Sequence, residues 1–247
     1  MITQNQIKYV KSLHQSKFRQ KYNNFIAEGD KIAQEILKNS IYKIEDLFAT
    51  QEWIDNNPHL EHKHQNLLTG INKKEMQKIS ALKTPSNVLI VLEKVPQTIN
   101  YKLMNEGHAI FLDDVQDPGN VGTIIRIADW FGIKSIIRSR GSADFYNPKV
   151  VQSSMASFLN VGLYCEDFED IDQSKHKTVG AAMIGEDIKS FKWPSLSMIV
   201  MGNEGKGIQS SIHQQLDHII SIKGADERLA ESLNVSVATG IICASIK

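Results

Sequence analysis

The chain has 247 residues, of which 41% are hydrophobic and 23% are charged, as in an ordinary globular protein. No apolar run reaches the roughly 20 residues of a membrane-spanning helix, and the N-terminus has lysines but lacks the apolar block of a secretory signal. Cys165 and Cys243 lie far apart, without the spacing of metal ligands. We therefore expect a cytoplasmic protein with reduced cysteines, no metal and no membrane partner.

The net charge is zero, but the charges are distributed unevenly. Residues 1–95 contain 14 Lys and Arg against 10 Asp and Glu, whereas the remaining residues contain 14 against 18. The first 21 residues hold five basic side chains and no acidic one. This asymmetry indicates an anionic partner near the N-terminus, although a charge run of this kind is also typical of a solvated helix face.

Residues 1–95 predict a small α/β domain, similar to those of ribosomal proteins. The segment NNFIAEGDKIAQEILKNS has the helical period, which places Ile32, Ile36 and Leu37 on one face of a helix that ends at residues 39–40. After it, the pattern predicts a strand, a short helix and a strongly apolar strand, at 44–50, 72–82 and 86–95.

Two other stretches of this half carry weaker signals. The polar stretch NPHLEHKH contains His59, His62 and His64, which could hold a metal, but no supporting element surrounds them, so a surface loop is preferred. Residues 96–107 have neither the helical nor the strand period. They are interpreted as a linker to a second domain at 108–247.

From residue 108 onward, short apolar segments alternate with helical ones. A helix is expected from about Asn120 to Phe131, and strands are expected within 108–115, 134–139, 178–184, 197–202 and 216–222. Continuous apolar strands between helices predict an α/β fold with a parallel sheet covered on both faces. Ligands of such sheets bind beyond the carboxyl ends of the strands, where three motifs of this chain fall.

The first motif is DDVQDPGNVGTIIR. Pro118-Gly119 predicts a turn and Asn120 predicts the helix N-cap. The face expected against the sheet carries Ile124, Ile127 and Phe131, and the opposite side carries Gly122, Arg126 and Asp129. Gly122 would leave room for a phosphate beside the Arg126 guanidinium, although an ordinary surface arginine explains this pattern equally well.

The other two motifs are MIVMGNEGKGI and ERLAESLNVSVATGIICASI. The first has a glycine-rich loop at 202–207, suited to close approach of a ligand. It matches neither the phosphate loop of nucleotide hydrolases nor the dinucleotide fingerprint of dehydrogenases. The second places Ser232 and Asn234 at the start of an apolar helix, a pattern that a well-capped C-terminal helix would also produce.

In their combination and order, N-x-G-x-x-x-R, M-G-N-E-G-x-G and S-L-N-V-S-V-A resemble the SpoU (TrmH) family of RNA ribose 2′-O-methyltransferases over about residues 106–247. FIAEGDKIAQEIL is similar, more loosely, to the opening of the family's accessory RNA-binding domain. The resemblance implies a C-terminal SPOUT domain with a deep trefoil knot. It also implies a homodimer with the active site near the subunit interface, and S-adenosylmethionine as the methyl donor.

The resemblance also implies roles for individual residues. The arginine matching Arg126 is held to activate the ribose hydroxyl with help from an RNA phosphate. Because the pKa of arginine exceeds about 12, we expect Arg126 to bind the phosphate and stabilise the developing alkoxide instead. Asn120 is expected to hold the hydroxyl or Arg126, and Glu204 to orient Arg126 or its own loop. Ser232 and Asn234 are expected to shape the cofactor and ribose site.

The methyl donor is expected to contact mostly backbone in the knotted loops, at Met183, Met201, Gly202, Ile222 and Leu233. Lys223 stands where the family usually has the proline of Ile-Pro-Met, and the segment before SLN is about two residues longer than usual. We therefore expect a more mobile loop on the adenine side and weaker cofactor binding.

The target follows from the accessory domain. Family members that act on transfer RNA usually have short basic helical extensions in its place, whereas those that act on large-subunit ribosomal RNA commonly carry a domain like residues 1–95. The resemblance therefore favours ribosomal RNA, with transfer RNA as the alternative. A non-catalytic RNA-binding assembly factor is the rival from another class, and the retained motif residues argue against it.

Overall fold

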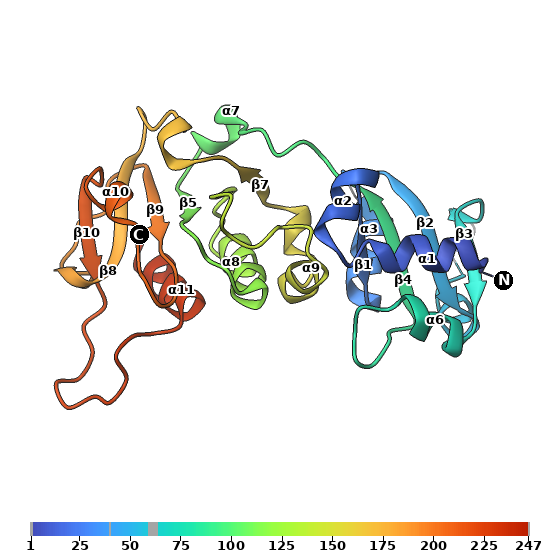
Figure 1. Ribbon diagram of the computed structural model, residues 1–247. Coiled ribbons are helices and arrows are strands. Elements are labelled where there is room, and N and C mark those ends of the chain that lie inside the picture. The colour runs from blue at the N-terminus through green and yellow to red at the C-terminus, as the bar shows by residue number, and fades with distance from the viewer. Residues whose placement is uncertain (1, 40, 59–63, 247) are drawn as a thin grey trace. The chain divides into compact units, whose positions relative to one another are not determined.

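The computed structural model describes all residues except 1, 40, 59–63 and 247. The chain forms two compact units (Figure 1). The first consists of Met1–Pro96 together with Asp144–Leu159, and the second of Gln97–Ala143 together with Asn160–Lys247.

The first unit is built on a four-stranded sheet in the order β1-β4-β2-β3. Its strands are β1 (Asn24–Glu28), β2 (Ile44–Thr50), β3 (Leu68–Ile71) and β4 (Val88–Glu93). β4 is antiparallel to both of its neighbours, and its apolar side chains are buried, as expected for a central strand. The sequence predicted β2 and β4 but missed β1, which lies just before the predicted helix.

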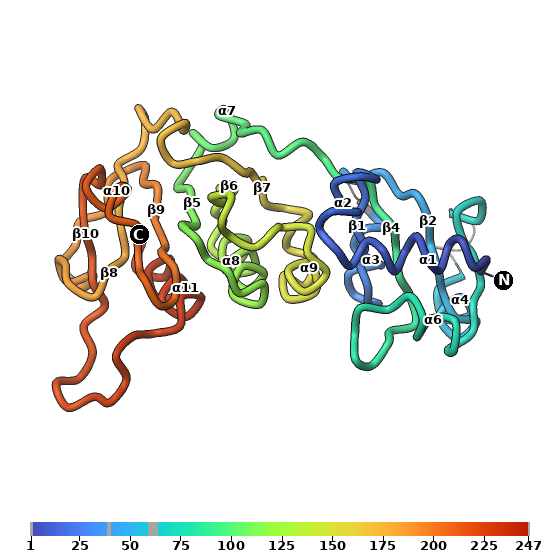
Figure 2. The backbone as a smooth tube through the Cα atoms, in the orientation of Figure 1, coloured from blue at the N-terminus to red at the C-terminus, as the bar shows by residue number. Residues whose placement is uncertain are grey.

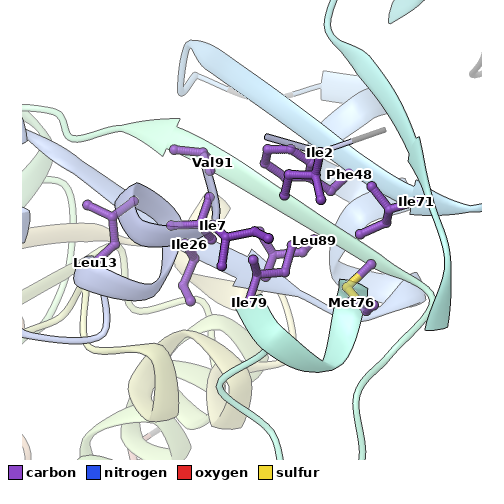
Figure 3. Close-up of a cluster of buried hydrophobic side chains, with 11 residues drawn as sticks. Ile2, Ile7, Leu13, Ile26, Phe48, Ile71, Met76, Ile79, Leu89 and Val91 are labelled. Carbon is purple, nitrogen blue, oxygen red and sulfur yellow. The ribbon is translucent and has the colours of Figure 1, made fainter. Parts of the chain in front are cut away.

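The described helices in the N-terminal part of this unit are α1 (Gln4–Ser12), α2 (Ser16–Tyr22), α3 (Asp30–Asn39), α4 (Gln51–Asn56) and α6 (Lys73–Ile79). Capping boxes begin α1 at Thr3 and α6 at Asn72, so both starts are determined locally. Figure 3 shows the core that these two helices share with the sheet, in which Ile7 of α1 lies close to Ile79 of α6.

The segment Asp144–Leu159 packs in the first unit although it lies far along the chain. It contains α9 (Pro148–Ser154) and η1 (Ser157–Leu159). The Arg19 guanidinium, 2% exposed, donates to the Asp144 carboxylate at 2.8 and 3.0 Å and to two backbone carbonyls. Phe25 and Tyr42 pack against Tyr146 and Phe158 of this segment. One of the five N-terminal basic residues is therefore part of the core.

The second unit has a six-stranded sheet in the order β10-β8-β9-β5-β6-β7, and every strand pair in it is parallel. The parallel sheet predicted from the sequence is confirmed. Its strands are β5 (Ala109–Leu112), β6 (Ser135–Arg138), β7 (Gly162–Cys165), β8 (Lys177–Asp187), β9 (Ser197–Met201) and β10 (His218–Ser221).

The helices of the second unit are α7 (Tyr101–Met104), α8 (Pro118–Trp130), η2 (Phe168–Asp170), α10 (Ser210–His213) and α11 (Val235–Ser245). α7 lies inside the stretch predicted as an irregular linker; its single turn is too short to show a period. In Figure 2 the chain between β10 and α11 extends from the sheet as a long irregular loop. No helix in the described part of the chain is long and apolar enough to cross a membrane.

Two predictions about α8 were wrong. Its N-cap is Asp117, whose carboxylate accepts the Asn120 amide hydrogen at 2.9 Å, because Pro118 occupies the first turn and starts the helix two residues early. The buried stripe carries Val121, Gly122, Ile124, Ile125 and Ala128. Consequently Phe131 is 43% exposed instead of facing the sheet, and Gly122, one turn before the exposed Arg126, belongs to the buried stripe.

Candidate active site

The site forms where two neighbouring strands end. β5 and β9 are parallel and in register, with Leu112 opposite Met201. The first residue after β5, Asp113, donates its backbone N–H to the Met201 carbonyl at 2.8 Å. The loops that begin at Asp113 and Gly202 therefore leave the sheet side by side, as the prediction of a site at strand ends requires.

Three motifs that are far apart in the sequence meet at the side chain of Asn120. Its Nδ2 donates to Oε1 of Glu204 at 2.9 Å, and its Oδ1 accepts from Nδ2 of Asn234 at 2.9 Å. The Asn120 amide is available for these bonds because Asp117, not Asn120, caps α8. Asn234 in turn caps α11, since its Oδ1 accepts from the backbone N–H groups of Ser236 and Val237.

The glycine-rich loop has a backbone that only glycine permits at its first position. A Cβ on Gly202 would overlap the backbone of Gly207 and Ile208, where the loop closes with a bridge between Asn203 and Gly207. At Gly205, by contrast, the nearest atom to an added Cβ would be 3.7 Å away. The close contact at Gly202 holds the loop against the end of β9.

Two residues that sequence reasoning missed anchor this loop. Asn203 donates to the Asp114 carbonyl at 2.8 Å and accepts from the Gly205 and Lys206 amides. Asp113, which is fully buried, accepts from the backbone N–H of Gln209 at 2.6 Å and from its side-chain amide. A buried carboxylate without a cation needs such donors. The pair of aspartates directly after an apolar strand was the signal available in the sequence.

Arg126 is not part of the hydrogen-bonded cluster at Asn120. Its side chain is exposed and makes no hydrogen bond or ion pair with any residue that the structure describes. Glu204 bonds Asn120 and not Arg126, so the expectation that Glu204 orients the arginine finds no support here. A guanidinium without a protein partner keeps all five N–H donors for an anion. Its role toward RNA stays a prediction.

Ser232 is exposed, and its hydroxyl makes no hydrogen bond within the described parts of the chain. It precedes Asn234 by two residues and lies in the loop outside α11. The role predicted for Ser232 in shaping the site stays a prediction.

Of the residues predicted to bind the cofactor, Met201 ends β9 and is followed by Gly202, Ile222 follows β10, Met183 lies within β8, and Leu233 precedes the α11 cap Asn234. Met201 is buried, and its carbonyl accepts from the backbone N–H of Asp113. β8 pairs with β10 at Gly180 and again at Glu186. The residues between these two positions do not pair with β10, and Met183 among them is exposed. Ile222 and Lys223 begin the long irregular loop.

Uncovered apolar side chains mark this region, namely Met183, Ile184, Leu229 and Leu233. Exposed large apolar groups of this kind are typical of surfaces that a ligand or partner covers. Apolar side chains beside loop backbone suit an adenosine and a thioether chain, which need shape and backbone hydrogen bonds more than charge. The donor set therefore fits S-adenosylmethionine. The effect of Lys223 on loop mobility and affinity stays a prediction.

The structure does not test the histidine cluster as a metal site. His59 and His62 lie outside the described residues, and His64 Nε2 is 3.4 Å from the Leu37 carbonyl oxygen. Among the residues that are described, no group of three His, Cys, Asp or Glu side chains could hold a metal ion.

Comparisons with known proteins assign the chain to a family. The model of the SpoU rRNA methylase family matches residues 107–244, and that of the MRM3-like substrate binding domain matches residues 4–90. The 23S rRNA (guanosine(2553)-2′-O)-methyltransferase RlmP of Bacillus subtilis is 28% identical over 246 residues, which are 96% of this chain and 93% of that protein. Human mitochondrial rRNA methyltransferase 1 is 29% identical over 56% of this chain and 44% of that protein.

Solved structures resemble the whole chain. A TrmH-family protein from Porphyromonas gingivalis is 29% identical, with a TM-score of 0.82 over 99% of this chain and 98% of that one. An AdoMet-bound rRNA methyltransferase from Sinorhizobium meliloti, 24% identical with a TM-score of 0.84 over 99% and 95% of the two chains, shares the fold.

Proposed function

This protein belongs to the SpoU rRNA methylase family, and we propose that it transfers the methyl group of S-adenosylmethionine to a ribose 2′-hydroxyl of large-subunit ribosomal RNA. The proposal rests on one observation: hydrogen bonds of the Asn120 side chain connect all three motifs. A protein that kept only the fold would have no need to hold these three side chains together.

The chemistry places few demands on the chain besides positioning. S-adenosylmethionine, when bound, would supply a methyl group on a sulfonium sulfur, so that an O–C bond can form as the C–S bond breaks in line and the neutral thioether S-adenosylhomocysteine leaves. Holding the two reactants in line then provides much of the rate. Gly202 and the loop from Ile222 to Leu233 hold the donor, and no metal is needed.

The acceptor hydroxyl must lose its proton, for which an adjacent RNA phosphate oxygen is the proposed acceptor, and its oxygen must carry negative charge in the transition state. Arg126 binds an adjacent RNA phosphate and stabilises this charge, since its exposed guanidinium has no hydrogen-bond or ion-pair partner in the described part of the chain and offers a planar set of donors. Asn120, held between Glu204 and Asn234, presents its amide beside the ribose. Ser232 contributes a hydroxyl at the same end of α11.

Ribosomal RNA is the proposed target for two reasons. A substrate-binding domain model covers residues 4–90, and the relatives with similarity along the chain include a named 23S rRNA 2′-O-methyltransferase. Residues 1–95 would hold the RNA, residues 96–107 would link the two domains, and residues 108–247 would carry the trefoil knot and the chemistry.

We further propose that the enzyme works in the cytoplasm as a homodimer. α8 and α11 pack together and expose apolar side chains: Trp130 (83% exposed), Phe131, Val237 and Ile241. A second copy would remove this surface from water. Sedimentation equilibrium should show a dimer, and Trp130→Glu should shift it toward monomer.

Methyl transfer tests the function directly. Tritiated S-adenosylmethionine is incubated with the enzyme and with ribosomal or transfer RNA extracted from cells that lack this protein. Label on ribosomal RNA, recovered as an alkali-resistant dinucleotide, is the expected result. Label on transfer RNA alone would reject the target and keep the chemistry. Absence of label from RNA and from ribosomal particles, with the cofactor bound, would favour an assembly factor.

A further inference from the structure

A cluster of aromatic rings and lysines covers the surface of α2. Phe18 and Tyr22, one helical turn apart, have nearly parallel rings, with centroids 6.2 Å apart and planes at 14°. Tyr9 of α1 packs edge-on against Tyr22 at 5.2 Å and 85°. Tyr22 is nevertheless 41% exposed. The ring is therefore held in a fixed orientation while part of it stays open to solvent.

Lysines lie over both of these rings. Lys17 Nζ is 4.9 Å from the centroid of Phe18, and Lys21 Nζ is 5.4 Å from that of Tyr22. Neither ammonium group forms an ion pair with an acidic residue in the described parts of the chain. The nearest basic residue in sequence, Arg19, is buried and paired with Asp144, so it adds nothing to this surface.

Neither α1 nor α2 carries an acidic residue. Burial, followed by the charges of Asp46 and Glu45 on β2, raises the pKa of Tyr9, so these two carboxylates lie on the Tyr9 side of the cluster. The first acidic residue of the chain is Glu28, which is buried. Its carboxylate accepts hydrogen bonds from Ser80, Ala81 and Ser86, so it is satisfied inside the domain. The lysines of α2 therefore present positive charge that no neighbouring carboxylate on α1 or α2 offsets.

We propose that Phe18, Tyr22, Lys17 and Lys21 bind an unpaired nucleotide of the substrate RNA, with its base stacked on Tyr22 and its phosphate at the lysines. The proposal rests on RNA being the substrate. An exposed ring held edge-on by a neighbour offers a stacking surface that every base can use. An exposed cation–π contact is weak, so a lysine readily leaves the ring for a phosphate. An acidic peptide would use the lysines but has no need of the ring.

The test measures RNA binding without S-adenosylmethionine, so its outcome does not depend on catalysis. The probes are a short single-stranded oligoribonucleotide containing one 2-aminopurine and an RNA hairpin with a fully paired stem. Tyr22→Leu should weaken binding of the single strand about tenfold and abolish the fluorescence quenching that stacking causes. Binding of the paired stem should change less than about twofold. Thermal melting confirms that the variant is folded.

Matched lysine variants distinguish specific binding at the α2 surface from nonspecific attraction of RNA by positive charge. Lys17→Ala/Lys21→Ala is compared with Lys74→Ala/Lys78→Ala on α6, an exposed pair at the same spacing without aromatic partners. The α2 double variant should lose about tenfold more affinity for the single strand than the α6 double variant. Its affinity should also depend less steeply on salt concentration than that of the wild type. Equal losses for the two pairs, equal effects of Tyr22→Leu on single and paired RNA, or tight binding of polyglutamate would each overturn the proposal. Failure of methyl transfer with these binding results intact would reject the catalytic role alone.

Discussion

Asn234 donates its side-chain amide to Oδ1 of Asn120 at 2.9 Å and thereby joins two motifs that lie 114 positions apart in the sequence. Each residue also has a second partner: Asn120 donates to Glu204, 84 positions away, and Asn234 accepts from the first turn of its own helix α11. A continuous series of hydrogen bonds therefore connects the start of α8, the glycine-rich loop and the start of α11. Changing the middle member should disturb the other two.

Asn120→Asp should lower methyl transfer by about 10²-fold, because it removes a donor and places a second carboxylate beside Glu204. Adding Glu204→Gln should restore part of the activity, since glutamine can donate to the new aspartate. A double-mutant cycle of single-turnover rates checks this coupling. Additive losses in the double variant would contradict the pairing.

Arg126→Ala should reduce the rate of methyl transfer by about 10²-fold or more while changing RNA affinity less than about threefold. Arg126→Lys should recover little, because an ammonium lacks the planar fork of the guanidinium. Lys134→Ala, another exposed cation of the second unit, serves as the control and should be neutral. Loss of affinity parallel to loss of rate would assign Arg126 to RNA binding.

Gly202→Ala should weaken S-adenosylmethionine binding by calorimetry at least about tenfold, because its Cβ would overlap the Gly207 backbone and displace the loop. Gly205→Ala, in the same loop, should bind S-adenosylmethionine normally, because the nearest atom to the added Cβ is 3.7 Å away. If both variants bound the cofactor equally well, this loop would not be part of the cofactor site.

Asp144→Ala should lower the free energy of unfolding by about 2–3 kcal/mol, because it leaves the buried Arg19 guanidinium without its counter-ion. Arg19→Met combined with Asp144→Leu should recover most of the loss, since two apolar groups need no partner. Urea unfolding of the three variants measures this. A loss in the double variant as large as in Asp144→Ala would show that the ion pair is not the cause.

Asp217 makes a pH-dependent contribution to the free energy of unfolding. The hydrogen bond from Lys177, with further bonds from Thr178, lowers the pKa of the Asp217 carboxyl to about 2. Because the folded pKa lies below that of the unfolded chain, this stabilisation is present above about pH 4 and is lost as the pH falls toward 2. Its size is below about 1 kcal/mol, since the carboxyl is largely exposed and screened by solvent.

Between pH 4 and pH 2, the free energy of unfolding of Asp217→Asn should therefore fall less than that of the wild type; this decrease is called the acid limb. Glu227→Gln, an exposed acid in the loop before α11, is the matched control and should leave the limb as it is in the wild type. An unchanged acid limb in Asp217→Asn would mean that other carboxyl groups account for the pH dependence.

The sequence alone determined the elements whose signals are local. Five buried apolar residues in a row predicted β4, alternating apolar and helical segments predicted the parallel sheet, and Asn234 was identified as lying at the start of α11. Each of these depends on neighbours within a few positions, through periodicity or a capping hydrogen bond. The start of α8 was missed by two residues because Asp117 and Asn120 are both good caps, and only Pro118 at the first turn separates them.

Only the tertiary structure decided which residues meet. The bonds from Asn120 to Glu204 and Asn234, and the Asp113 anchor of the glycine-rich loop, join segments brought together by strand order, which no local pattern encodes. The placement of Asp144–Leu159 in the first unit likewise depends on a buried ion pair with Arg19. Residue types and spacing set which chemistry is available, whereas packing of distant elements sets where each side chain finds its partner.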